Sequence, residues 1–352
     1  MKQYKIAVIG GDGIGPEVTR EGVKVLRRAA QLDGGFSFSF TELPWGCDYY
    51  RRTGRMMPED GLAQLRPFDA IFLGAVGDPG VPDDLSLHGL LLAIRRGFDQ
   101  YVNLRPIKLL RGAETPLKKA AREDIDMIFV RENSEGEYAG LGGRMYAGQE
   151  REFVTQTGVF SRRGTSRIIR YAYELARAQK KSLTSISKGN ALNHSMVYWD
   201  EIFREIGRQY PDVETKTLLV DAASMLMITH PERFGVVVAS NLFGDILTDL
   251  GAAIAGGIGL AAGANLNPER SFPSMFEPIH GSAPDIKGKG LANPMAAIWS
   301  ASQILDFFGH ADWGARVLAA MERVLEDKRV LTPDMGGSAA TAQVGDAVAA
   351  AL

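Results

Sequence analysis

Short apolar runs alternate with segments of helical spacing along most of the chain. The run 5–9 leads into a glycine loop, and the segment 17–30 then places its apolar residues on one side of a helix. Strands that alternate with helices predict an α/β fold with much parallel sheet. We predict further strands at 69–73, 126–130, 183–186, 217–220 and 235–239, and further helices at 165–180, 195–209, 294–308 and 313–327.

No repeat or low-complexity linker marks a domain boundary. The length of 352 residues favours about two domains, and the glycine-rich stretch 251–263 is the best candidate for a crossing point between them. Hydrophobic residues make up 45% of the chain and charged residues 23%, which is typical of a globular protein with a large core.

Charge and cysteine content exclude several classes of protein. The formal net charge is −2, so no general basic field indicates nucleic-acid binding. Cys47 is the only cysteine, which rules out a disulfide within the chain and fits a reducing compartment. We interpret it as a buried thiol rather than a reactive one.

The sequence has no apolar stretch long enough to span a membrane and no signal-peptide pattern, so we expect a cytoplasmic protein.

The glycine loop after the first strand reads Gly11-Asp12-Gly13-Ile14-Gly15-Pro16. Its spacing differs from the dinucleotide-binding pattern of Rossmann folds, and the Asp12 carboxylate would repel a pyrophosphate. We therefore predict a structural turn in which the backbone approaches another segment closely.

Two acids lie one helical turn apart in the segment 241–250, at Asp245 and Asp249. Like charges at this spacing destabilise a helix unless a cation compensates them. We place Asp221 at the end of a strand, where ligands bind in parallel sheets. Three carboxylates suit Mg²⁺ or Mn²⁺ better than zinc. The alternative is a solvated acidic helix face.

Four basic residues lie at or near the ends of apolar segments. Arg95, Arg105 and Arg131 can each bind a carboxylate through two parallel hydrogen bonds. Arg131 opens a polar loop that contains Tyr138, and Lys188 follows the predicted strand 183–186. Taken alone, each of these residues is more simply interpreted as a solvated charge or a surface ion pair. The prediction of a substrate site therefore depends on their combination.

These residues fall in four long motifs: GGDGIGPEV, RENSEGEYAG, NLFGDILTDLGAAIAGGIGL and EPIHGSAPDIKGKGLANP. Nearly end to end, the chain resembles the β-decarboxylating dehydrogenases, the family of isocitrate, isopropylmalate, homoisocitrate, tartrate and D-malate dehydrogenases. The segment GLLLAIRRGFDQYVNLRP is most similar to the tartrate and D-malate branch. Gly89 stands at about the spacing where isocitrate enzymes have a serine upstream of the first arginine, and the glutamate that isopropylmalate enzymes have near the place of His88 is missing. We expect leucines 90–92 to fill the space of a larger substituent.

The resemblance implies a role for each candidate residue. Asp245 and Asp249, with Asp221 of the neighbouring subunit, would hold Mg²⁺ or Mn²⁺, and the family also allows K⁺. Tyr138 would be the catalytic acid, and Lys188, supplied by the other subunit, would act at the substrate hydroxyl. The three arginines would bind the substrate carboxylates. The residues implied for NAD binding are His280, Gly281, Ser282, Ala283, Asp285 and Asn293.

The resemblance also implies the architecture and the reaction. The fold is the two-domain isopropylmalate-dehydrogenase-like α/β fold, with a mostly parallel sheet and no Rossmann fold. Residues 1–100 plus 257–352 would form a discontinuous dinucleotide-binding domain, and residues 101–256 the metal, substrate and dimerisation domain. We expect a homodimer with shared active sites and without nucleic-acid or membrane partners.

The expected reaction is the oxidation of tartrate or D-malate at C2 by NAD, followed by decarboxylation. The alternatives are a 3-isopropylmalate or isocitrate dehydrogenase, a redox-neutral tartrate decarboxylase (a lyase), and a regulatory nucleotide-binding protein with a vestigial site. The sequence leaves open the preferred diacid, the preferred metal and any assembly beyond a dimer.

Overall fold

The first strand, β1 (Lys2–Gly11), runs through a tight glycine turn into helix α1 (Gly15–Asp33). A Cβ atom on Gly11 would lie 2.0 Å from the carbonyl oxygen of Ala75, and one on Gly13 would lie 1.8 Å from that of Ser282. Asp12 is buried, and its carboxylate accepts hydrogen bonds from the amides of Cys47 (2.7 Å) and Gly77 (2.9 Å). The prediction of a structural turn is confirmed, because only glycine tolerates such close backbone contacts.

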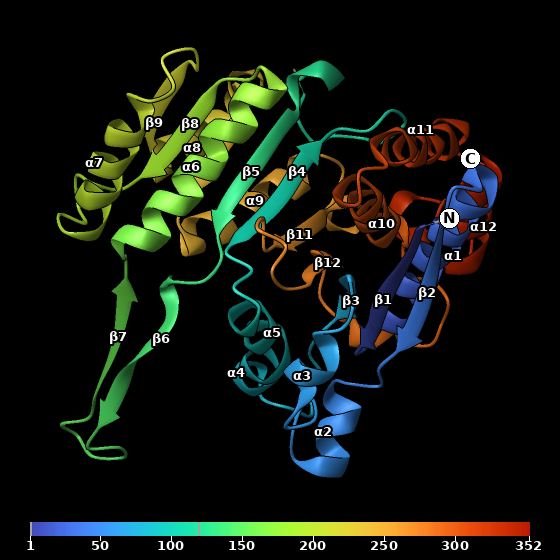
Figure 1. Cartoon of the computed structure of the whole chain (residues 1–352), viewed down its shortest axis with the longest axis horizontal. Coiled ribbons are helices and arrows are strands. Elements are labelled where there is room, and N and C mark those ends of the chain that lie inside the picture. Colours follow the sequence, from blue (N-terminus) through green and yellow to red (C-terminus); the bar gives the residue numbers. More distant parts are fainter. Residues whose placement is uncertain (1, 119) are drawn as a thin grey trace. The chain divides into compact units, whose positions relative to one another are not determined.

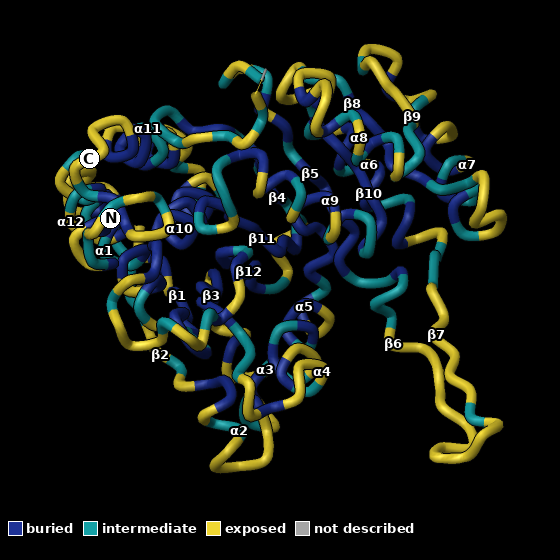
Figure 2. Tube along the Cα trace, turned by 180° about the vertical axis from the view of Figure 1, so that it is seen from behind, coloured by how far each residue is buried: buried dark blue, intermediate teal, exposed yellow. Residues whose placement is uncertain are grey.

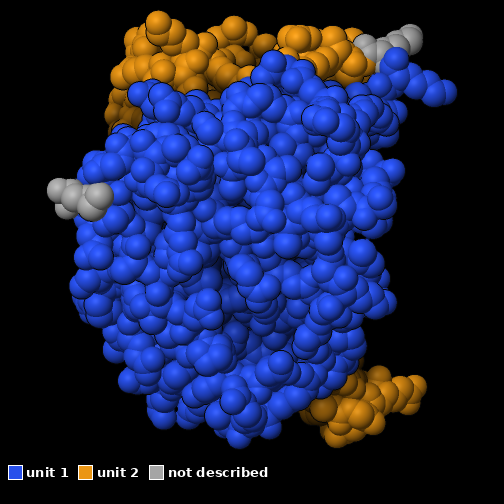
Figure 3. Space-filling model, turned by 90° about the vertical axis from the view of Figure 1, so that its right-hand side faces the viewer, with its two compact units in different colours: residues 1–100, 108–118, 252–352 blue, residues 101–107, 119–251 orange. Residues whose placement is uncertain are grey.

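The computed structural model describes residues 2–118 and 120–352, and the chain divides into two units, coloured separately in Figure 3. Unit 1 comprises Met1–Gln100, Lys108–Lys118 and Ala252–Leu352, and unit 2 comprises Tyr101–Ile107 and Lys119–Gly251. The chain thus leaves unit 1 twice, briefly at 101–107 and again for most of its middle part, and returns to it finally at Ala252, inside helix α9 (Asn241–Ile254).

Unit 1 contains five strands in the order β2-β1-β3-β12-β11. Neighbouring strands are parallel except for the antiparallel pair of β11 and β12. The strands not yet given are β2 (Phe36–Glu42), β3 (Ala70–Ala75), β11 (Ala262–Leu266) and β12 (Ser274–Pro278), and the helices are α2 (Cys47–Thr53), α3 (Gly61–Leu65), α4 (Asp83–Ser86), α5 (Leu92–Gly97), α10 (Met295–Phe307), α11 (Ala311–Asp327) and α12 (Thr341–Ala350).

The alternation of side chains along these strands builds two apolar layers. Ile9 and Leu73 pack with Cys47 and Leu90 in a buried cluster on one side of the sheet. On the other side Phe72 meets α1 at Gly22, where a Cβ would lie 2.5 Å from the ring. Helix α1 packs in turn against α10 and α12. Cys47 is buried as predicted, and burial, followed by the neighbouring Asp12, raises the pKa of its thiol to about 12.

In unit 2, five strands follow the order β4-β5-β10-β8-β9, of which β5, β10, β8 and β9 are parallel to one another, and β6 and β7 pair separately. Helix α6 packs against β5, β10 and α7. The bounds in this unit are β4 (Val102–Lys108), β5 (Asp126–Glu132), β6 (Gly136–Met145), β7 (Phe153–Val159), β8 (Leu183–Ser187), β9 (Thr215–Leu219), β10 (Val236–Ala239), α6 (Arg162–Gln179), α7 (Ser195–Gly207) and α8 (Val220–Thr229).

Strands β6 and β7 form an antiparallel hairpin that extends away from the sheet of unit 2 (Figure 1). Figure 2 shows that most of the hairpin is exposed, in contrast to the buried central strands. Its partners across the ladder include Leu141 with Thr157 and Met145 with Phe153, so Leu141, Met145 and Phe153 lie on one face. This face is apolar and has no cover within the described chain.

All predicted strands and helices are present within a few residues, and the α/β class is confirmed. One placement was wrong. Asp221 does not end a strand, because β9 ends at Leu219 and Asp221 lies in the first turn of α8. In the parts of the chain that the structure describes, no helix is both long and apolar enough to cross a membrane.

Candidate active site

Asp245, in the second turn of α9, is the centre of a polar cluster in unit 2. Arg131 Nη1 donates a hydrogen bond to Asp245 Oδ1, and Tyr138 donates its phenolic proton to Oδ2 at 2.7 Å. Arg105 Nη1 lies 3.5 Å from Oδ1. Both arginines are buried, whereas the Asp245 side chain is 35% exposed, so the carboxylate is the part of the cluster that solvent reaches.

Arg131 comes from the end of β5 and is held by α9 as well. Its Nε and Nη2 donate to Asn241 Oδ1 at 3.0 and 2.7 Å. Gly244 makes this approach possible, because a Cβ there would lie 2.6 Å from Cγ of Arg131. The guanidinium also lies 5.4 Å from the ring centre of Tyr138. The side chain is therefore fixed in one position before any ligand binds.

Arg105, on β4, is fixed in a similar way. Its Nε donates to Asn103 Oδ1 at 2.8 Å, and its Nη1 donates to Thr248 Oγ1 at 2.6 Å. Thr248 lies on the same face of α9 as Asp245, three residues later. The two arginines thus present fixed donors beside one carboxylate.

Tyr138 lies near the start of β6. Burial, and then the hydrogen bond to Asp245, raise the pKa of its phenol, so the group is protonated at neutral pH. The loop before it is anchored by Glu132, which is buried and accepts hydrogen bonds from the Ser134 amide (2.8 Å), the Ser134 hydroxyl (2.6 Å) and the Glu135 amide (2.9 Å). These contacts hold Tyr138 in a defined place.

The predicted acidic trio is not assembled within one chain. Asp249 follows Asp245 by one turn and is exposed. Its pKa is raised, mainly by partial desolvation; the Asp245 charge adds to this effect and Arg105 opposes it. Asp221 instead accepts a hydrogen bond from Lys188 Nζ at 2.8 Å, and this contact lowers its pKa. Among residues 2–118 and 120–352, no three acids, histidines or cysteines gather where they can hold a metal ion.

In unit 1, Arg95 lies on α5 and pairs with Glu277 on β12. Arg95 Nη2 donates to Glu277 Oε1 at 2.7 Å, and Asn265 Nδ2 donates to the same oxygen at 2.8 Å. Both charged groups are buried. Arg95 Nε is also buried and makes no hydrogen bond within the described chain, so one donor of the guanidinium is unused.

The helical turns before Arg95 correct one expectation. Leu90 is fully buried in the core of unit 1 and Leu92 is nearly so, so neither is a substrate wall as we expected for 90–92. The exposed side chains are Leu87 and His88, and Leu91 is partly buried against the core. The nearest hydroxyl, on the buried Ser86, donates to the Asp83 carbonyl at 3.0 Å and is therefore engaged.

The segment 280–293 follows β12 as an open loop. Ser282 accepts a hydrogen bond from the Ile14 amide at 2.8 Å, which ties the loop to α1. Ala283 has a left-handed backbone (φ 40°) and leads into a short 3₁₀ turn that carries the exposed Asp285. Gly281 is likewise exposed, and a Cβ there would meet nothing within 4 Å.

Two side chains of this loop are buried. Asn293 is already engaged, since it donates to Asp334 and accepts from the Met295 amide, each at 3.0 Å. His280 Nδ1 donates to the Gly281 carbonyl at 2.9 Å, and burial lowers the pKa of the ring, so it is neutral at pH 7. Its Nε2 is then an acceptor that is buried and has no partner among the described residues.

Sequence reasoning missed three residues of these clusters. Asn241 and Thr248 lie four residues before and three residues after Asp245, so the helical period places them on its face. Glu277 opens the motif EPIHGSAPDIKGKGLANP, but no local pattern indicated its pairing with Arg95, which is distant in sequence.

The chain was compared with known proteins. The family model for isocitrate/isopropylmalate dehydrogenase matches residues 5–348. A D-malate dehydrogenase (decarboxylating) of Escherichia coli is 52% identical over 99% of this chain and 98% of its own length, and a tartrate dehydrogenase/decarboxylase of Pseudomonas putida is 50% identical with the same coverage. Among solved structures, an isocitrate dehydrogenase from Methylococcus capsulatus matches with a TM-score of 0.89 and 35% identity over 99% of both chains.

Proposed function

The chain belongs to the isocitrate/isopropylmalate dehydrogenase family, and from this premise we propose that it oxidises D-malate or a tartrate at C2 with NAD and decarboxylates the product. The observation that carries the proposal is the cluster around Asp245. It offers two fixed arginines, a protonated tyrosine and a carboxylate in one place. A hydroxy diacid can use all of them, because its carboxylates need cationic partners and its reacting carbons need an acid nearby.

The donor chemistry at α9 fits a divalent metal. Asp245 and Asp249 supply hard oxygen ligands one turn apart, and Asp221 of a partner subunit would supply a third. Bound Mg²⁺ or Mn²⁺ supplies Lewis-acid chemistry, which acidifies the substrate hydroxyl and stabilises charge during loss of CO₂. In its absence, the hydrogen bonds from Arg131 and Tyr138 hold the Asp245 carboxylate in a fixed orientation.

The chain's own side chains account for the remaining steps. Arg105 and Arg131, with Arg95, would bind the two substrate carboxylates. Lys188 of the partner would take the hydroxyl proton while hydride leaves C2 for the nicotinamide. After CO₂ departs, Tyr138 would return a proton to C3, for which its raised pKa keeps the phenol in the donor form.

The loop 280–293 is the proposed adenosine site of NAD. The unpartnered, neutral His280 Nε2 is an acceptor suited to an exocyclic amine of a base. The exposed Asp285 would accept hydrogen bonds from the ribose hydroxyls and repel a 2′-phosphate. Asn293 can contribute only if its contact with Asp334 rearranges.

Cofactor choice tests this assignment. We expect kcat/KM to favour NAD over NADP, and Asp285→Ala to reduce that preference by tenfold or more, about 1.4 kcal/mol. Steady-state rates with both cofactors measure it. Gly288→Ala in the same loop, which meets no atom within 4 Å but has a positive φ, controls for simple loop disturbance. A wild-type preference for NADP would contradict the proposal.

The proposed homodimer with shared sites is supported by exposed apolar side chains near the acids of the candidate site. Met225 and Ile228 on α8 and Ile246 on α9 are exposed although they are large and apolar, and they flank the acids at 221, 245 and 249. Joining these surfaces would bring Asp221 and Lys188 of one chain to the Asp245 of the other.

Substrate choice is tested by a direct panel. D-malate, the tartrates, 3-isopropylmalate and isocitrate are compared by kcat/KM under one metal and NAD condition. We expect a four-carbon diacid to be preferred, because the Ser86 hydroxyl is engaged and offers nothing to a third carboxylate. A tenfold preference for isopropylmalate or isocitrate would overturn the substrate assignment. With tartrate, the ratio of NADH to CO₂ separates oxidation from redox-neutral decarboxylation.

A further inference from the structure

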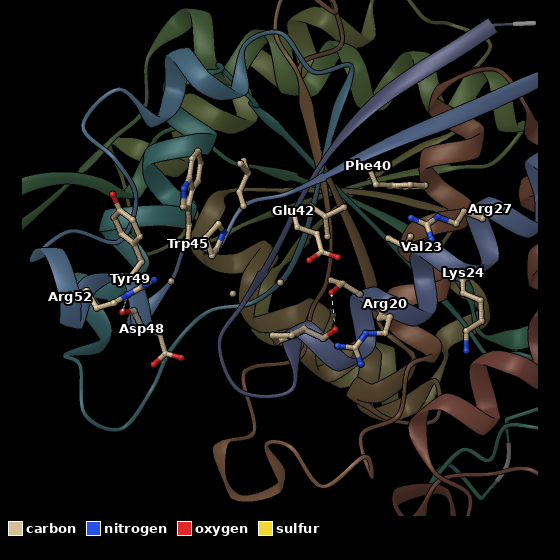
Figure 4. A pocket seen from close by; sticks show the side chains of 18 residues that line it. Arg20, Val23, Lys24, Arg27, Phe40, Glu42, Trp45, Asp48, Tyr49 and Arg52 are labelled. Atoms are coloured by element: carbon tan, nitrogen blue, oxygen red, sulfur yellow. Dashed lines mark hydrogen bonds between the residues drawn. The ribbon is translucent and has the colours of Figure 1, made fainter.

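A pocket of about 1010 Å³ lies in unit 1, and no residue of the loop 280–293 lines it, although Lys287 of that loop lies 3.8 Å from the lining residue Asp48. It opens at the carboxyl ends of β1 and β2, between α1 and the segment 42–52 (Figure 4). None of the residues with a proposed catalytic, metal or NAD-binding role lines it. Its position is where nucleotides bind in many α/β units, next to the first two strands and the helix between them.

Arginines on α1 provide positive charge on one side of the pocket. Arg20 makes no ion pair or hydrogen bond within the described chain, and Arg27 only lies over the ring of Phe40, 5.2 Å from its centre. The third cation of this helix face, Lys24, is neutralised by Glu21 and Asp346. Two guanidinium groups are thus available for an anion, and arginine favours phosphate through paired hydrogen bonds.

Glu42, the last residue of β2, supplies an acceptor in the middle of the pocket. It too has no hydrogen bond or ion pair among the residues the structure describes. An acid at the end of the second strand of a strand–helix–strand unit is where ribose hydroxyls are bound. Asp48, the other acid of the pocket, is paired with Arg51 at 2.6 Å.

Aromatic side chains form the opposite end. Figure 4 shows Tyr49 at one end of the pocket, Glu42 in the middle, and Phe40 with Arg27 at the other end. The indole of Trp45 forms part of the wall beside Tyr49 and is almost completely buried. Arg52 lies over the Tyr49 ring at 5.9 Å, so this end offers flat surfaces to a base.

The glycine loop limits what can bind. Its Ile14 amide donates to the Ser282 carbonyl, and the loop backbone is in direct contact with that segment. A pyrophosphate therefore cannot take the usual place at the N-terminus of α1. The pocket can take one nucleotide but not a dinucleotide in the usual orientation.

We propose that this pocket binds a nucleoside monophosphate, as a second site independent of catalysis. The base lies against Tyr49, the ribose hydroxyls donate to Glu42, and the phosphate lies between Arg20 and Arg27. Tyr49, Glu42 and the pair of Arg20 and Arg27 follow one another along the pocket in the order of base, sugar and phosphate, while Arg52 lies beside Tyr49 and Phe40 beside Arg27.

Calorimetric titration of the full-length protein with AMP, in saturating NAD so that the loop 280–293 is already occupied, tests the proposal. Arg20→Ala and Glu42→Gln should each weaken AMP binding tenfold or more. Arg28→Ala is the matched control, because Arg28 is on α1 but outside the pocket, and it should change nothing. Asp285→Ala, at the proposed NAD site, should also leave AMP binding unchanged. Circular dichroism confirms that each variant is folded.

The competing outcomes are distinct. AMP binding that is lost in Asp285→Ala but kept in Arg20→Ala would place AMP at the loop 280–293 and overturn the proposal. Absence of AMP binding to the wild type would overturn it as well. Inorganic phosphate and ribose 5-phosphate are titrated in parallel. If phosphate alone binds as tightly as AMP, the pocket is an anion site and the nucleoside part is wrong.

Discussion

Arg131 and Asp245 show how a buried charge is maintained before any ligand is present. Arg131 is 1% exposed, and Asn241 and Asp245 together occupy its Nε, Nη1 and Nη2. An uncompensated charge at this depth would cost several kcal/mol, so the aspartate has a structural task in addition to its proposed role as metal ligand.

Asp245→Asn should therefore have two effects. We expect most activity and most affinity for Mg²⁺ or Mn²⁺ to be lost while the fold persists. The free energy of unfolding of the metal-free protein should fall by about 1–3 kcal/mol, because two buried arginines lose their counter-ion at a partly exposed carboxylate. Metal titration and urea unfolding in EDTA measure the two effects.

Asp249→Asn is the matched control for that experiment. It removes the same charge from the same helix face, but Asp249 is exposed. It should weaken metal binding with little change in the stability of the metal-free protein. Equal losses of stability in both variants would contradict the structural role of Asp245, and full activity in EDTA would contradict the metal role.

At the scale of elements, the β6–β7 hairpin stands out because it has no core of its own. A lone two-stranded hairpin is marginally stable in water, yet its Leu141, Met145 and Phe153 are all about half exposed on one face. An apolar face on a projecting arm is typical of an interface.

Charge on that face should weaken the proposed dimer. We expect Phe153→Asp and Leu141→Asp each to raise the dimer dissociation constant tenfold or more, because burial of one large side chain contributes about 1.5–3 kcal/mol. Val154→Asp, on the opposite face, should have a smaller effect. Analytical ultracentrifugation measures the constants. If Val154→Asp disrupts the dimer most, the interface lies on the other face.

Much of the fold could be predicted from the sequence because the buried parallel strands are apolar runs and the long helices have one apolar side. The hairpin could not, since β6 is rich in glycine and its apolar positions face no core of the same chain. Strand β2 was missed although Phe36, Phe38 and Phe40 alternate with polar residues, a signal that was available. The pairing of β12 with β3 joins segments far apart in the chain, and no local pattern reports it.

Some features of the candidate site could likewise be predicted from the sequence, and others could not. Residue types and spacing pointed to Asp245, Asp249 and the arginines, because charges next to apolar runs are conspicuous. The hydrogen bonds between β5 and α9 that fix Arg131 depend on tertiary contact, as does the choice of Lys188 as the partner of Asp221.

At the scale of the whole molecule, the proposed shared sites predict complementation between two inactive variants. Lys188→Ala and Asp245→Asn homodimers should each be inactive. After subunit exchange, mixed dimers should regain one intact site, and activity should reach about a quarter of the wild-type level, because half of randomly mixed dimers are mixed and each has one working site of two.

Native mass spectrometry of the mixture verifies that exchange has taken place. The control mixes Asp245→Asn with Asp249→Asn chains, whose defects lie on the same helix and would leave each site of a mixed dimer with one damaged acid. Recovery in that control, or none in the main experiment after verified exchange, would contradict sharing.

The division of the chain also sets the order in which a ribosome can complete the protein. Every strand of unit 2 has been synthesised by residue 251, whereas unit 1 still lacks β11 and β12, which extend its sheet beyond β3. Helices α10 and α12, against which α1 packs, emerge later still. Until then the part of α1 that packs against α10 and α12 has no cover, and a nascent chain in this state needs protection from aggregation. The N-terminal strand and helix are therefore among the first segments to be made and the last to be buried.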